Sequence, residues 1–204
     1  MTDPTPSPRS PEEAIAELLA GNDRYVAGRT ESTNPPEARA GLAAGQAPFA
    51  AFIRCADSRV APELVFDQPL GAIFVTAIAG NVVTTEVVAS LEYAVEVLGT
   101  RLVVVMGHSG CGAVEAAIRY RDQPEALPGS LPELIAQVTV TGGSTDGEDL
   151  PGRVATSVVA NANAGVDQLL RHSPVIAEAV REERARVVAG VFDLGTGRFE
   201  LTRP

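Results

Sequence analysis

The sequence predicts an α/β fold: a central, mostly parallel sheet of four parallel strands plus an antiparallel fifth, flanked by helices. Short apolar runs rich in β-branched residues alternate along the chain with longer segments whose apolar residues recur at helical spacing. Strands that alternate with helices are typical of right-handed crossovers and hence of a parallel sheet. The last two apolar runs are separated only by residues 195–197, Gly-Thr-Gly, which indicates a hairpin and an antiparallel last strand.

The amino-terminal part of the chain is predicted to contain a disordered tail and a first helix. Residues 1–9 are rich in Pro, Ser and Thr, a composition typical of disorder, and residues 10–204 are expected to form a single domain. Residues 10–13, Ser-Pro-Glu-Glu, are a capping box with proline at the first helical position. Apolar residues then recur at helical spacing as far as Gly28, and a shorter helical piece ends at Gly45.

The remaining elements follow from the same two periodicities. Continuous apolar runs indicate buried strands, and one-sided apolar stripes indicate amphipathic helices. The expected strands are 49–54, 72–76, 101–106, 186–193 and 198–202, and the expected helices are 84–98, 110–120 and 154–170. Residues 142–152 are acidic and glycine-rich. Their spacing fits no EF-hand, which favours a solvated loop over a calcium site.

Two short segments contain the chain's only two cysteines and one of its two histidines. Residues 55–59 read Cys-Ala-Asp-Ser-Arg, and residues 107–112 read Gly-His-Ser-Gly-Cys-Gly. Each follows a predicted strand, so both are expected at the carboxyl edge of the sheet, where α/β proteins place their sites. Thiolate, imidazole and carboxylate are the ligand types of tetrahedral zinc. The predicted metal ligands are Cys55, Asp57, His108 and Cys111.

Two nucleophilic sites compete with the zinc interpretation. The residues around Ser109 approach the Gly-x-Ser-x-Gly elbow of serine hydrolases, but Cys111 replaces the last glycine. Such an enzyme would also need His172 as its base, whereas this histidine is more simply a cation at a helix end. Cys111 activated by His108 is the second possibility. It leaves the residues from Cys55 to Arg59 without a role.

A closed structural zinc site is the non-enzymatic alternative. Structural sites use four protein ligands, and Asp57 can be the fourth. Arg59 argues against this, because it is placed to pair bidentately with Asp57 and take it off the metal.

The two motifs resemble those of the β-class carbonic anhydrases, in particular the plant-like branch. The resemblance is close over roughly residues 10–120 and loose over the remainder. It implies one zinc per chain bound by Cys55, His108 and Cys111, with Asp57 and Arg59 as a pair that governs the fourth ligand. The implied reaction is the reversible hydration of carbon dioxide to bicarbonate and a proton. Hydrolysis of carbonyl sulfide or carbon disulfide is the alternative, because the same nucleophile attacks the same kind of carbon.

The resemblance also implies a cleft and an assembly. Gln46, Phe74 and Tyr93 match cleft residues of the plant-like branch, where they act partly across a dimer interface, so a homodimer or homotetramer is expected. One stretch departs from the family pattern Arg-Asn-x-Ala/Gly-Asn: residues 77–81 read Ala-Ile-Ala-Gly-Asn. A cation near the cleft or the subunit contact is therefore expected to be missing, which would lower turnover or loosen the dimer.

Composition excludes several other classes of function. A net charge of -10 and a pI near 4.7 disfavour nucleic acid as a partner. The chain has no lysine, which excludes Schiff-base chemistry and a P-loop. It has neither an apolar stretch long enough to span a membrane nor a signal peptide, so a cytoplasmic protein without membrane contact is expected. Two cysteines are too few for a disulfide framework.

Overall fold

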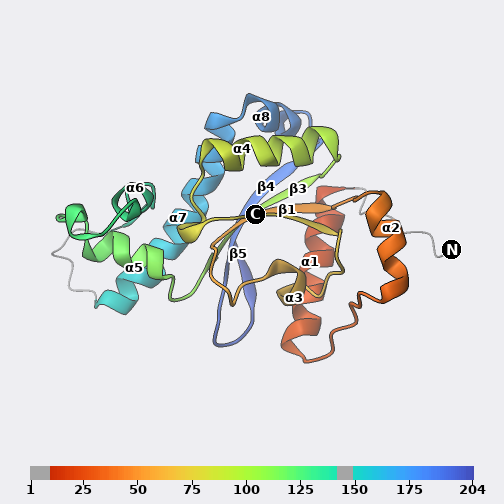
Figure 1. The fold of residues 1–204 in the computed structure, drawn as a ribbon, viewed down its shortest axis with the longest axis horizontal. Coiled ribbons are helices and arrows are strands. Elements are labelled where there is room, and N and C mark those ends of the chain that lie inside the picture. Colours follow the sequence, from red (N-terminus) through yellow and green to blue (C-terminus); the bar gives the residue numbers. More distant parts are fainter. Residues whose placement is uncertain (1–9, 142–148) are drawn as a thin grey trace.

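A five-stranded sheet forms the centre of the computed structural model, which describes residues 10–141 and 149–204 (Figure 1). The strand order is β2-β1-β3-β4-β5, with the first four strands parallel and β5 antiparallel to β4. This confirms the predicted fold class. The strands are β1 Ala50–Arg54, β2 Ile73–Ala77, β3 Leu102–His108, β4 Arg186–Phe192 and β5 Phe199–Arg203.

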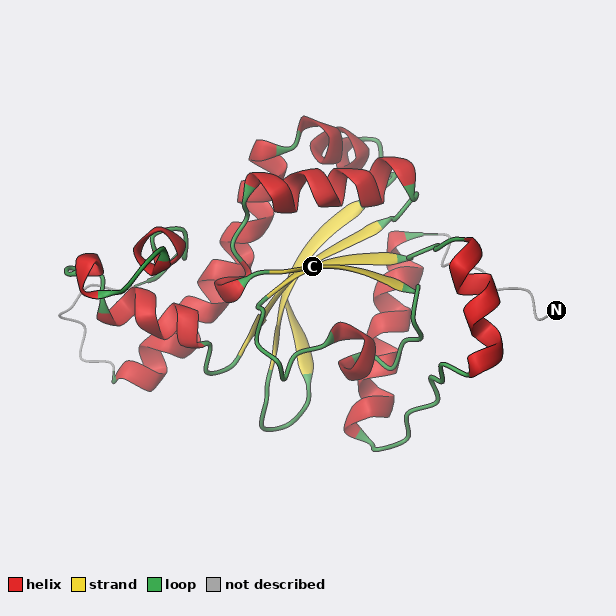
Figure 2. Ribbon diagram, viewed as in Figure 1, coloured by secondary structure: helices red, strands yellow, loops and turns green. Residues whose placement is uncertain are grey.

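Helices cover both faces of this sheet (Figure 2). They are α1 Pro11–Val26, α2 Arg39–Ala44, α3 Pro62–Val65, α4 Thr85–Glu92, α5 Gly112–Arg119, α6 Leu131–Ile135, α7 Leu150–His172 and α8 Pro174–Arg181. Short 3₁₀ turns occur at Pro36–Ala38, Ala79–Asn81 and Pro124–Ala126, and α4 continues into a π-helical turn at Tyr93–Val97. Within the described ranges no helix is both long and apolar enough to cross a membrane.

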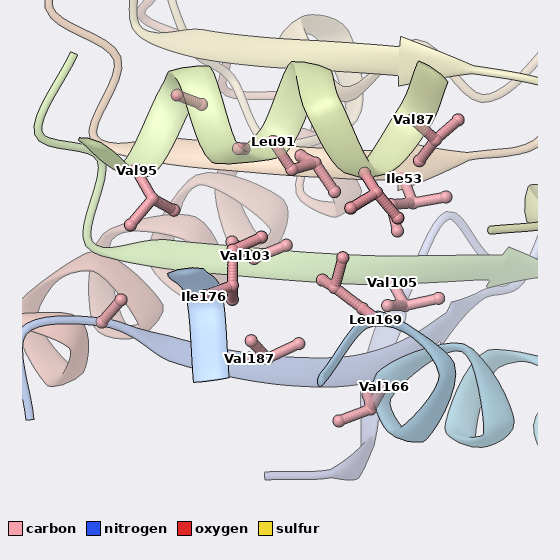
Figure 3. Close-up of a cluster of buried hydrophobic side chains, with 14 of the residues drawn as sticks. Ile53, Val87, Leu91, Val95, Val103, Val105, Val166, Leu169, Ile176 and Val187 are labelled. Atoms are coloured by element: carbon pink, nitrogen blue, oxygen red, sulfur yellow. The ribbon is translucent and has the colours of Figure 1, made fainter. Parts of the chain in front are cut away.

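The two faces of the sheet have separate cores because successive strand residues point to opposite sides. In β1, Ala51 and Ile53 pack with α4, α7 and α8 on one face (Figure 3). Ala50 and Phe52 pack with α1 and α3 on the other. A continuous apolar run is therefore needed in these strands, which explains why they could be recognised from sequence.

Most predicted elements are present, with differences at their ends. The predicted capping box of α1 is formed: Ser10 Oγ accepts from the Glu13 N–H and the Glu13 carboxylate accepts from the Ser10 N–H. The helix predicted at 154–170 is longer, because Asp149 caps it by accepting from the Gly152 N–H at 2.9 Å. The end of the predicted 142–152 loop is thus the first turn of α7. Residues 142–148 and the predicted tail at 1–9 lie outside the described residues.

Candidate metal centre

Three side chains meet at the carboxyl edge of the sheet. Cys55 directly follows β1, His108 is the last residue of β3, and Cys111 is the residue before α5. Because β1 and β3 are adjacent and parallel, these strand ends lie side by side. The two Sγ atoms and a ring nitrogen of His108 all lie within 4.8 Å of one another, and all three residues are buried.

The geometry of this cluster fits a tetrahedral metal ion. The two Sγ atoms are 3.9 Å apart and form no disulfide. Two thiolates bound to tetrahedral zinc at about 2.3 Å would be separated by about 3.8 Å. His108 Nδ1 lies 3.0 Å from the Ser109 carbonyl oxygen, whereas its buried Nε2 has no hydrogen-bond partner. Since Nδ1 must donate to that carbonyl, Nε2 presents a free lone pair to the cluster.

The protonation of the cluster also favours a cation. The hydrogen bond from Cys111 lowers the pKa of Cys55 to about 4, against the opposing effect of burial. The same bond and burial raise the pKa of Cys111 well above its usual range. Burial is the largest single effect and acts to lower the pKa of His108, but the nearby Cys55 sulfur, the Ser109 carbonyl and the Asp57 carboxylate together outweigh it, so the pKa is raised. A second thiolate at Cys111 would be repelled by the thiolate of Cys55, and a bound dication would remove that repulsion.

Asp57 lies beside the cluster but is bound to Arg59. Its Oδ1 accepts from the Arg59 N–H at 3.0 Å and from Nε at 2.9 Å, and its Oδ2 accepts from an Arg59 terminal nitrogen at 2.7 Å. Oδ2 is also 3.9 Å from His108 Nε2. The Arg59 side chain holds the pKa of Asp57 well below its usual range, although burial opposes the shift. The structure thus shows the bidentate pair that was predicted.

Arg54, which the sequence reasoning missed, holds the backbone of the same loop. One terminal nitrogen donates to the Cys55 carbonyl at 2.7 Å and to the Asp57 carbonyl at 3.2 Å. In the sheet register Arg54 is the partner of Ala77. An arginine therefore lies beside Ala77 on the neighbouring strand, where it holds the metal-site loop, and the effect of the cation expected to be missing at residue 77 stays a prediction. The position of Arg54 directly before Cys55 was the feature of the sequence that could have identified it as part of the site.

This placement changes what substitutions at Ala77 should do. We expect Arg54→Ala to lower the rate of the hydration reaction that the sequence resemblance implies, because the loop of Cys55 and Asp57 loses two hydrogen bonds to a charged group, each worth about 1.5–3 kcal/mol. Ala77→Arg with Ile78→Asn should restore part of the rate in that background, since residue 77 lies beside residue 54 in the register. In the wild type the same pair of changes places two cations together and should bring little gain. Rates and subunit association of the four proteins test this. Equal effects in both backgrounds would contradict it.

The predicted cleft residues lie away from the metal cluster within one chain. Gln46 is exposed and precedes β1, at the amino edge of the sheet. Phe74 is near the amino end of β2, and its ring centroid is 6.4 Å from that of Tyr93, which is 48% exposed. The cluster that contains Cys55 lies beyond the opposite, carboxyl edge. The structure therefore brings Phe74 and Tyr93 together but does not bring them to the metal ligands of the same chain.

The competing serine-hydrolase site is not formed. Ser109 Oγ accepts from the Leu194 N–H at 2.9 Å and anchors the β4–β5 turn. His172 is the last residue of α7, eleven residues or about 16 Å of helix beyond Asn161. Asn161 contacts the metal-site loop through Gly80, so His172 lies at the opposite end of this helix from Ser109.

Comparison with known proteins identifies the family. A family model described as carbonic anhydrase matches residues 50–199. Carbonic anhydrase 2 of Mycobacterium tuberculosis is 38% identical over 195 residues, which cover 94% of this chain and 93% of that protein. This chain belongs to the carbonic anhydrase family.

The solved structures refine this to a class. A Coccomyxa β-carbonic anhydrase in complex with acetazolamide has a TM-score of 0.72 and 26% identity, over 93% of this chain and 82% of that one. One of two tetrameric β-carbonic anhydrases from Sordaria macrospora has a TM-score of 0.63 and 25% identity, over 92% of this chain and 95% of that one. The chain is therefore a member of the β class.

Proposed function

We propose that this protein catalyses the reversible hydration of carbon dioxide to bicarbonate and a proton. It would use one zinc ion per chain bound by Cys55, His108 and Cys111. The observation that carries the proposal is that three ligands converge while Asp57, a carboxylate beside them, is bound to Arg59. A site with three protein ligands and an open fourth position is the pattern of catalytic rather than structural zinc. Membership of the carbonic anhydrase family supports the same reaction.

The residues around the cluster would supply orientation and a dry cleft. When bound, zinc lowers the pKa of a coordinated water from about 15.7 to about 7, so a nucleophile exists at neutral pH. Asp57, fixed by Arg59, would accept a hydrogen bond from that nucleophile and direct its lone pair. Contributed from a second subunit, Gln46 would donate to a substrate oxygen, and the rings of Phe74 and Tyr93 would keep water out.

Stopped-flow measurement of carbon dioxide hydration on protein of known zinc content tests this proposal. We expect a rate that scales with zinc content. Zinc-loaded protein without hydration activity would overturn it. Hydrolysis of carbonyl sulfide or carbon disulfide by such protein would then identify the alternative substrate, and inactivity towards all three would indicate a structural zinc site.

We further propose that the active unit is a homodimer, or a tetramer of two dimers, with β2 at the subunit contact. β2 is an edge strand of the sheet. Phe74 lies on it and contacts Tyr93, and the exposed Val97 ends the π-helical turn that begins at Tyr93. A two-fold axis at this edge would set the amino end of one β2 against the carboxyl end of the other. The aromatic pair of one subunit would then approach the metal cluster of its partner, which is the arrangement the resemblance implies. The Sordaria macrospora relative, which is described as tetrameric, supports this proposal.

Subunit mixing tests the shared site. His108→Ala removes a metal ligand, and Phe74→Ala removes part of the cleft, so each homodimer should have low activity. After equal mixing and exchange, we expect recovery towards about one quarter of wild-type activity, because half of the dimers are mixed and each has one complete site. If all site residues came from one chain, the mixture would show only the average of the two variants. That result would contradict the shared site.

Two further assignments are also proposals. Gln46, Phe74 and Tyr93 support membership of the plant-like branch. The two free cysteines support a location in the cytoplasm, because a reducing compartment would preserve them.

A further inference from the structure

We propose that Asn161, in the middle of α7, is a positioning residue for the metal centre. It acts through the backbone of Gly80, whose N–H donates to the sulfur of Cys55. Asn161 is 106 residues beyond Cys55 in the chain and belongs to neither metal motif. The inference rests on the proposed zinc site, and it concerns how this chain fixes one of the ligands.

The amide of Asn161 has a single possible orientation. The residue is 4% exposed, and its Oδ1 accepts from the Thr139 N–H at 2.8 Å. Its Nδ2 donates to the Gly80 carbonyl at 2.8 Å. A backbone N–H can only donate and a carbonyl can only accept, so the two neighbours determine which end of the amide carries the oxygen. Both hydrogen bonds are short, the one to Gly80 is buried and the one from Thr139 is partly buried, and the side chain joins α7 to two separate loops.

Gly80 is the point at which this restraint reaches the metal ligand. Its N–H lies 3.4 Å from Cys55 Sγ, within the range of a hydrogen bond to sulfur. Gly80 has a φ of 73°, a left-handed conformation that glycine adopts without strain. Glycine has no side chain to restrict its own rotation, so a contact from elsewhere must fix the direction of its N–H. The hydrogen bond from Asn161 to the carbonyl of the same residue provides that contact.

The neighbours of Gly80 leave no room for a side chain at this position, so a bulkier residue cannot restrict the backbone in place of the hydrogen bond from Asn161. A Cβ built on Gly80 would lie 3.0 Å from Val138 Cγ2 and 3.2 Å from the Ala113 side chain. A larger residue with a better defined backbone would therefore collide with its neighbours. The site combines a glycine, which permits close packing, with a buried amide, which supplies the rigidity that glycine lacks. Substitution of a residue that only supports a metal ligand typically lowers metal affinity by about 10–100-fold.

The test is the spectrum and metal affinity of the Asn161→Asp protein loaded with Co²⁺. Aspartate keeps the acceptor for the Thr139 N–H but has no donor for the Gly80 carbonyl. We expect Co²⁺ and Zn²⁺ affinity to fall by about 10–100-fold. The thiolate-to-cobalt charge-transfer band should move to lower energy, because the sulfur loses a hydrogen bond that stabilises its lone pairs. Asn161→Ala, which introduces no charge, should shift the band in the same direction.

Two variants of α7 serve as matched controls. Ser157 is also fully buried and accepts from the Thr141 N–H at 3.1 Å, so Ser157→Ala loosens the same loop without touching Gly80. Asn163 accepts from Thr202 Oγ1 at 2.7 Å, so Asn163→Asp repeats the chemical change elsewhere on the helix. Both should keep the wild-type band and affinity.

The outcomes separate this inference from the proposed zinc site. Wild-type protein that bound neither Co²⁺ nor Zn²⁺ would refute the zinc site itself. A wild-type protein with a normal charge-transfer band, together with unchanged spectra in folded Asn161→Asp and Asn161→Ala, would refute the role of Asn161 alone. The same shift in Ser157→Ala would also refute it, because the effect would then come from the loop rather than from Gly80.

Discussion

His108→Ala is expected to lose nearly all of its zinc and with it the hydration activity. Two cysteines remain, but tetrahedral zinc sites in enzymes use three protein ligands, and within residues 10–141 and 149–204 the group of possible ligands contains no residue besides Cys55, His108 and Cys111. The loss of affinity should exceed the roughly 10–100-fold that removal of a supporting residue costs. Metal analysis after dialysis against a chelator measures this directly, and stopped-flow rates on the same samples connect it to activity.

His172→Ala is the matched control, since it is the chain's only other histidine. It ends α7 and is exposed. It should keep one zinc per chain and the full rate. Full zinc occupancy in His108→Ala would refute the ligand set. A large loss of activity in His172→Ala at full occupancy would point to a catalytic role for that histidine.

The core strands and the metal motifs could be predicted from the sequence because their causes are local. β1 and β3 are buried on both faces, which requires continuous apolar runs. The ligands follow these strands directly, so strand ends and ligands were identified together. The fifth strand followed from a turn of only three residues. The boundaries were less predictable where a cap decided them, as for Asp149 at the start of α7.

The contacts that hold the ligands in place could not be predicted in this way. Asn161 reaches Gly80 across 81 residues of sequence, and an asparagine within a helix pattern carries no local sign of such a contact. Arg54 depends on the register between β1 and β2, which places it beside Ala77. The separation of Phe74 and Tyr93 from the metal ligands likewise depends on which end of each strand a residue occupies.

Arg59→Ala is expected to keep its zinc but to lose most of its activity at neutral pH. In the structure Arg59 occupies both oxygens of Asp57. Without Arg59 the Asp57 carboxylate is free to take the fourth metal position. Asp57 also loses the partner that holds it in the orientation needed to direct the nucleophile. We expect a rate loss of at least about tenfold, which corresponds to about 1.4 kcal/mol of transition-state stabilisation. The rate of Arg59→Lys should lie between those of the wild type and Arg59→Ala, because an ammonium group cannot bind both oxygens of Asp57 in the geometry of a guanidinium.

The pH profile of Arg59→Ala should distinguish occupation of the fourth metal position by Asp57 from the simple loss of a positive charge. The pKa of Asp57 is held well below its usual range, so the carboxylate stays ionised, and the contribution of the pair to stability is lost only in strong acid. Titration of Asp57 therefore cannot open or close the site between pH 5 and 9. In zinc-loaded protein a rise in pH would instead favour hydroxide over the Asp57 carboxylate in the position that the three ligands leave open. The activity of Arg59→Ala should recover partly at high pH, with its midpoint shifted upwards from that of the wild type.

Arg119→Ala provides the matched control for this last prediction. Arg119 forms a similar exposed pair with Glu115 at 2.6 Å on α5, the helix that begins after Cys111, but it does not touch Asp57. Its removal changes the net charge of the protein by the same amount and should alter neither the rate nor the pH profile by more than a small factor. Asp57→Ala should also keep zinc, yet lose rate without the upward shift, because no carboxylate is left to compete. Normal rate and an unaltered profile in Arg59→Ala would show that Arg59 is only a structural partner of Asp57.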